Sequence, residues 1–142
     1  MISTVNVSSA RNRLAGLWFL VSGILFIVLF IQTLGGYYGD RVQEAWGWLL
    51  PLLLPTLSLI IGVFVADPLN KVLESARTSR FVYRLALCLS SVYLLALLVV
   101  ALVGQLTKLA PLDLMKVSSL GLGPLGGLVT AAVGIFFVKK GK

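Results

Sequence analysis

Four long stretches of this chain carry no charged side chain. They are residues 14–34, 47–66, 85–104 and 117–138, each between 20 and 22 residues long. A helix needs about 20 consecutive apolar residues to cross the hydrocarbon core of a bilayer. Inside lipid the backbone polar groups must be satisfied within the chain, so each stretch should cross as a complete helix. The sequence therefore predicts an all-α membrane protein with four transmembrane helices in a compact bundle.

The composition excludes a soluble domain and a disordered chain. Hydrophobic residues make up 58% of the chain and charged residues 12%, whereas soluble domains have about 25% charged residues. Little remains outside the four stretches, so residues 1–142 should form a single transmembrane domain. The first stretch, preceded by Arg11 and Arg13, has the alternative of a signal peptide. We expect it to be retained, because its 21 residues exceed the apolar core of about 7–15 residues in such peptides.

The Lys and Arg residues are distributed unequally between the two sides of the expected membrane domain. Three Lys or Arg residues lie on the side of the first and third connections. The other side carries nine, namely Arg11, Arg13, Lys71, Arg77, Arg80, Arg84, Lys139, Lys140 and Lys142. Cytoplasmic segments carry the Lys and Arg excess, so both termini are expected to be cytoplasmic. The expected location is the bacterial inner (plasma) membrane. This topology explains the net charge of +7 without a nucleic-acid partner.

Aromatic residues gather around the first outer connection. Tyr37, Tyr38, Trp46 and Trp48 lie there, at the level where amphipathic rings favour lipid headgroups. Trp18 lies one turn into the first stretch from the other side. We expect these rings to anchor the helices at the membrane interfaces, with binding of an external molecule by Trp46 and Trp48 as the alternative.

The connections contain recognisable helix boundaries. Gly35 and Gly36 should end the first helix, and Asp40 is a candidate N-cap for the second. Residues 105–116, which include Pro111, suggest a bend lying at the interface.

The inner connection predicts a short amphipathic helix over residues 68–77. Asp67 and Pro68 form a helix start, and apolar residues then recur at helical spacing. A basic cluster covers this connection, and it either sets the topology or docks an acidic partner. Its members are Lys71, Arg77, Arg80 and Arg84.

The four stretches contain no Asp, Glu, Lys, Arg or His. Proton relays, ion pathways and intramembrane catalysis need such groups, so we expect no enzyme, no catalytic residue, no metal site and no cofactor. Ser58, Ser90 and Ser91 should form hydrogen bonds between helices. Cys88 should be a small packing residue, with reversible acylation as the alternative.

Two prolines interrupt the second stretch. Pro51 and Pro55 lie four residues apart, and each removes one backbone hydrogen bond from a helix. They produce either a static kink or a hinge or pore-lining segment.

The fourth stretch carries a stripe of small residues, Gly123, Gly127, Ala131 and Gly134. Their spacing places them on one helix face, where small side chains allow another backbone to approach closely. The stripe packs either inside the bundle or against another copy. The sequence thus favours a membrane subunit or anchor that acts through helix–helix association, as a homo-oligomer or with a membrane protein partner. The alternative is a small oligomeric channel or pore-forming effector.

Overall fold

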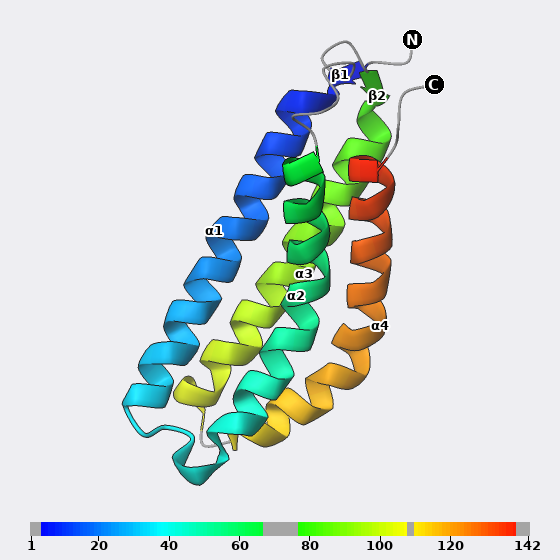
Figure 1. The fold of residues 1–142 in the computed structure, drawn as a ribbon. Helices are drawn as coiled ribbons and strands as arrows, with labels where there is room; N and C mark the ends of the chain where they lie inside the picture. The colour runs from blue at the N-terminus through cyan, green and yellow to red at the C-terminus, as the bar shows by residue number, and fades with distance from the viewer. Residues whose placement is uncertain (1–3, 67–76, 108–109, 139–142) are drawn as a thin grey trace.

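Four long helices run side by side along the molecule (Figure 1). The computed structural model describes residues 4–66, 77–107 and 110–138. The helices are α1 (Val7–Leu34), α2 (Val42–Ala66), α3 (Arg80–Leu106) and α4 (Pro111–Val138). Each is long and apolar enough to cross a membrane and contains one of the four predicted stretches. The predicted all-α fold with four transmembrane helices is confirmed, and this is a polytopic membrane protein.

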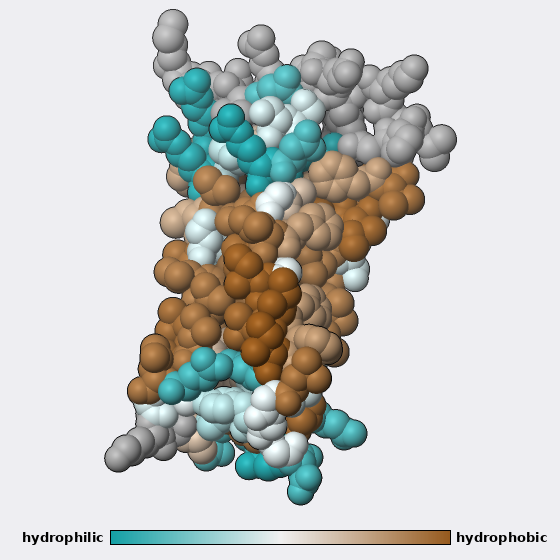
Figure 2. Space-filling view, turned by 90° about the vertical axis from the view of Figure 1, so that its left-hand side faces the viewer, coloured by the Kyte–Doolittle hydropathy of each residue, from teal (hydrophilic) through white to brown (hydrophobic). Residues whose placement is uncertain are grey.

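The outer surface of the bundle matches a bilayer. Figure 2 shows an apolar band across the middle of the face in view, with hydrophilic residues at both ends. Large apolar side chains such as Leu20, Ile27 and Leu95 point outward and are more than half exposed. Lipid tails solvate such side chains as well as a protein core does, so this surface is suited to the membrane interior.

A short ribbon that the sequence did not predict joins the starts of two helices. Strand β1 (Thr4–Asn6) pairs antiparallel with β2 (Arg77–Ser79). Asn6 then caps α1 through its side chain, and Ser79 caps α3 in the same way. The ribbon holds these two helix starts together, at the end of the bundle where α4 also finishes (Figure 1). Of the predicted inner helix over 68–77, residues 68–76 lie outside the described residues, and residue 77 belongs to β2.

Glycines close the first outer turn as predicted. Helix α1 ends at Leu34, and the backbone N–H of Gly35 bonds to the carbonyl of Ile31. Gly36 and Gly39 then adopt positive φ angles of 71° and 54°, which other residues reach only with strain. Asp40 lies inside the 3-10 turn η1 (Gly39–Arg41), which follows Tyr38 and leads directly into α2, so it does not precede the helical segment as an N-cap would.

Much of the expected interfacial bend over residues 105–116 belongs to the two helices. Helix α3 continues to Leu106 and α4 already begins at Pro111, while residues 108–109 lie outside the described residues. Proline suits the first position of a helix, where its missing N–H has no partner to lose. A Cβ at Gly104 would lie 2.7 Å from that of Pro111, so glycine allows the two helices to meet here.

Polar side chains inside the bundle join α1 to α3. The indole of Trp18 is fully buried and donates a 3.0 Å hydrogen bond to the hydroxyl of Ser90. Trp18 is therefore a core residue, and the expectation of an interfacial ring is wrong. Ser90 forms the predicted interhelical bond, whereas Ser58 and Ser91 lie on the exposed surface.

A second polar contact lies near the outer end of the same helix pair. The amide of Gln32 donates a 3.0 Å bond to the carbonyl of Ala101, and the hydroxyl of Tyr38 donates to the Gln32 side-chain oxygen. Burial, with a smaller contribution from Tyr37, raises the pKa of Tyr38 to about 12. The phenol therefore keeps its proton and remains a donor.

A buried arginine connects α1 to the end of α4. Arg11 is 5% exposed and donates a 2.6 Å bond to the carbonyl of Phe137, and its guanidinium lies 5.4 Å from the centre of the Phe137 ring. The last carbonyls of a helix have no partner within it and favour a cation. Arg11 is thus a structural residue as well as one of the positive charges from which the sequence analysis predicts the orientation.

The Trp18–Ser90 bond provides a test of the bundle. Ser90→Ala should leave the buried indole N–H without its acceptor and lower the free energy of unfolding by about 1 kcal/mol. Ser91→Ala, at the exposed neighbouring position, should change it by less than about 0.5 kcal/mol. Denaturant unfolding of the detergent-solubilised protein measures both, and equal effects of the two substitutions would contradict the assignment.

Candidate functional site

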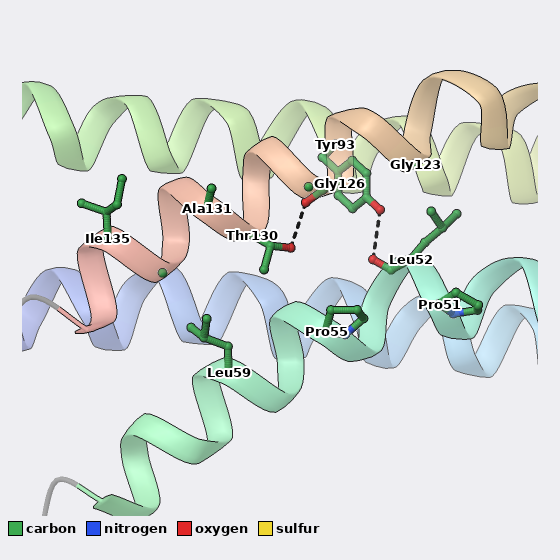
Figure 3. Close-up of a pocket in the computed structure, with 12 residues that line it drawn as sticks. Pro51, Leu52, Pro55, Leu59, Tyr93, Gly123, Gly126, Thr130, Ala131 and Ile135 are labelled. Carbon is green, nitrogen blue, oxygen red and sulfur yellow. Dashed lines mark hydrogen bonds between the residues drawn. The ribbon is translucent and has the colours of Figure 1, made fainter.

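An open groove lies between α2 and α4 (Figure 3). It encloses about 970 Å³, which is within the range of small-molecule sites. Helix α2 contributes Pro51, Leu52, Pro55 and Leu59, and α3 contributes Tyr93. The wall formed by α4 consists mostly of small residues, namely Gly123, Gly126, Gly127, Thr130, Ala131, Gly134 and Ile135.

The groove brings together all four residues of the predicted small-residue stripe. Gly123, Gly127 and Ala131 are exposed, and a Cβ built at Gly123 or Gly127 meets no atom within 4 Å. Among the three glycines of the stripe, only Gly134 approaches α2, where a Cβ would lie 3.4 Å from Leu59 Cδ1. Most of the stripe therefore faces outward from this bundle.

The close contact inside the bundle depends on a different glycine. A Cβ at Gly126 would lie only 2.7 Å from the hydroxyl oxygen of Tyr93. That hydroxyl donates a 2.9 Å bond to the carbonyl of Leu52 (Figure 3), so the phenol crosses from α3 to α2 over the glycine. The sequence analysis missed this pair, although a tyrosine amid apolar residues signals a need for a hydrogen-bond partner.

Two threonines fix the spacing of α2 and α4 beneath the groove. The Thr130 hydroxyl donates to the carbonyl of Gly126 at 2.8 Å. Its oxygen lies 2.8 Å from the hydroxyl oxygen of Thr56. Since Thr130 has one proton to donate, Thr56 is the donor to Thr130. No ionised side chain is among the described residues that line the groove.

Three prolines lie in the interior of the helices that border the groove. Pro51 and Pro55 are exposed along it, and the ribbon of α2 changes direction beyond Pro55 (Figure 3). The sequence analysis did not consider Pro124 in the interior of α4, a helix whose ribbon bends along its length (Figure 1). Each proline removes an N–H from the backbone ladder, so both groove walls are kinked.

The outer end of the groove carries charge. A second hollow of about 480 Å³ shares Pro51, Leu52 and Gly123 with the groove and is lined by Glu44 and Lys116. The Lys116 ammonium lies 3.2 Å from the Glu44 carboxylate. Arg41 reaches that same carboxylate at 2.8 Å. We call the part of this hollow around Glu44 and Lys116 the outer mouth.

Three of the four aromatic residues expected at the outer interface are more enclosed than the sequence suggested. Tyr38 and Trp48 are buried, and the Trp48 indole donates to Ser118 at 3.2 Å. Trp46 is half-buried and donates to Thr33 at 3.2 Å, while Tyr37 is exposed. Tyr38 and Trp48 thus connect helices, which differs from a purely interfacial role.

The remaining predicted residues lie on the opposite end or on the surface. Arg80 and Arg84 are exposed at the start of α3, Arg77 lies in β2, and Lys71 is outside the described residues. Cys88 is exposed on α3, so it is not enclosed by its neighbours. Within the described residues, no group of three or more His, Cys, Asp or Glu side chains could hold a metal ion.

Comparison with protein-family models, with curated proteins and with solved structures finds no match to this chain. The groove geometry is therefore the basis for the functional proposal below.

Two neighbouring glycines distinguish the inner and outer faces of α4. Gly126→Ala should force Tyr93 off the Leu52 carbonyl and lower the free energy of unfolding by about 1–3 kcal/mol, the usual cost of overpacking. Gly127→Ala should leave it unchanged or raise it by up to about 1 kcal/mol, because alanine favours helices over glycine. Thermal or denaturant unfolding in detergent measures both. Equal destabilisation by the two substitutions would contradict the orientation of α4.

Proposed function

We propose that this membrane protein is a subunit or anchor that binds a further transmembrane helix in the groove between α2 and α4. The helix belongs to a second copy of the chain or to a different membrane protein. One observation carries the proposal. No atom lies within 4 Å of a Cβ built at Gly123 or Gly127, so the backbone of these exposed residues is accessible from the membrane.

Helix association in lipid favours such a surface. Lipid tails are as apolar as leucine, so burying apolar surface does not drive helices together. Close packing against small residues does, and three of the four stripe residues are exposed for it. Leu59 of α2 and Ile135 of α4 line the two walls of the groove and provide apolar contacts for the incoming helix.

We also propose that both termini face the cytoplasm, with the protein in a plasma membrane. The starts of α1 and α3 and the end of α4 share one end of the bundle (Figure 1). The nine Lys and Arg residues of the sequence that were assigned to this side support the orientation. The outer mouth then faces outside.

The alternative of a channel has less support from the groove. A water-filled path needs polar groups along its wall. The hydroxyls of Thr130 and Tyr93 are engaged in hydrogen bonds to backbone carbonyls. Pro51 and Pro55 remain candidates for a hinge that adjusts the groove to its partner.

A bulky side chain in the groove tests the proposal. Gly127→Leu should block the approach of another backbone and cost the association about 1–3 kcal/mol, a shift of about tenfold or more in the association constant. The complex should dissociate to a smaller species in mild detergent, while the thermal unfolding of the single chain stays unchanged.

Gly121→Leu is the matched control, because Gly121 is an exposed glycine of α4 with open space before it and does not line the groove. Light scattering and native electrophoresis distinguish the variants. Association that survives Gly127→Leu, or that is lost equally with Gly121→Leu, would refute docking in the groove.

A further inference from the structure

We infer that the groove between α2 and α4 also binds one phosphatidylethanolamine molecule, with its headgroup at the outer mouth and one acyl chain along the groove. The inference rests on the proposed function, because the lipid takes the docking site of the partner helix. The incoming helix must then displace the lipid, which makes association dependent on membrane composition.

The hollow at the outer mouth continues into the groove and together they are long enough for one acyl chain. Gly123 and Gly134 mark the ends of the groove on α4, and at about 1.5 Å per residue they lie about 16 Å apart along the helix. Half of a hydrocarbon core of about 30 Å is about 15 Å. Lys116 lies about 10 Å before Gly123 along the helix, so a chain that starts at the outer mouth would reach the membrane midplane near Gly126 and Gly127, within the first part of the groove.

The wall of the groove suits a hydrocarbon chain. Its lining consists of apolar side chains and bare glycine backbone, apart from Thr130 and Tyr93. The hydroxyls of both residues already donate to backbone carbonyls. An acyl chain brings no polar group that needs a partner, so burying it there leaves no hydrogen bond unmade.

The charges at the outer mouth suit a zwitterionic headgroup. Lys116 and Arg41 offer cations for a phosphate, and Glu44 offers a carboxylate for a primary ammonium. Asp113 also attracts Arg41, so the four side chains carry two positive and two negative charges. A purely anionic headgroup would place further negative charge beside these carboxylates. The ethanolamine ammonium has N–H donors for Glu44, which the quaternary ammonium of phosphatidylcholine lacks.

Ser119 adds a neutral hydrogen-bond acceptor at the outer mouth. Ser119 lines the outer hollow with Glu44 and Lys116, and its hydroxyl donates to the carbonyl of Lys116 at 2.6 Å. The hydroxyl oxygen remains able to accept a bond from the ammonium of the lipid.

Native mass spectrometry of the full chain in detergent tests the inference on the monomeric species. Phosphatidylethanolamine, phosphatidylcholine and phosphatidylglycerol with identical acyl chains are added separately at equal concentration. The wild-type protein should retain one phosphatidylethanolamine with an affinity about fivefold above that for phosphatidylcholine. Glu44→Gln should abolish this preference, and Lys116→Gln should weaken binding of both lipids.

One further variant locates the acyl chain, and two others serve as controls. Gly127→Leu should lower phosphatidylethanolamine binding, whereas Gly121→Leu and Arg84→Gln, which lie outside the groove, should not. Equal binding of the three lipids, a preference for phosphatidylglycerol, or insensitivity to Glu44→Gln and Gly127→Leu would each overturn the inference.

The lipid measurement does not depend on helix association. If the protein shows no lipid selectivity but Gly127→Leu still weakens association, the lipid site is overturned and the proposed function stays intact. If the protein binds lipid selectively but Gly127→Leu changes no association, the proposed function is refuted. The displacement of lipid by a helix is then refuted as well.

Discussion

Hydrogen bonds and close backbone approaches hold these four helices together, because a bilayer removes the usual gain from burying apolar surface. The polar contacts join different helix pairs, and each satisfies a group that would otherwise lie unpaired in a dry interior. At the α3–α4 pair, glycine allows direct approach instead. The contacts are Trp18–Ser90 and Gln32–Ala101 for α1–α3, Trp46–Thr33 for α1–α2, Tyr93–Leu52 for α2–α3, Thr56–Thr130 and Trp48–Ser118 for α2–α4, and Arg11–Phe137 for α1–α4.

Helix α4 shows how one glycine-rich sequence can serve two surfaces. Gly126 faces Tyr93 and permits close contact within the bundle. Gly123 and Gly127 lie on the adjoining face, where a Cβ would meet no atom within 4 Å. The same helix therefore separates folding from association. Substitution at the inner glycine should affect stability, and substitution at the outer glycines should affect what binds. On our proposal, a helix and a lipid chain compete for one groove because both need an apolar surface without protruding side chains.

Sequence alone predicted the four crossings, the glycine turn at Gly35 and the interhelical role of Ser90. It did not predict how each helix is rotated about its axis, because apolar residues surround these helices on nearly every side and no polar face marks the outside. Trp18 and Arg11 were therefore assigned to the membrane boundary, although both are buried. The stripe of α4 was visible in the sequence, but the groove depends on the neighbouring α2, which only the packed structure reveals.

Membrane topology is the basis of the whole functional proposal, because the outer mouth meets the outer leaflet only if the chain crosses four times from the cytoplasm. Reporter fusions at two positions test this most directly. A reporter after Lys142 should be active in the cytoplasm, and one inserted at Asp40, in the turn η1 between α1 and α2, should be active outside. An external reporter after Lys142, or both reporters on the same side of the membrane, would contradict the four-helix orientation and the placement of the groove.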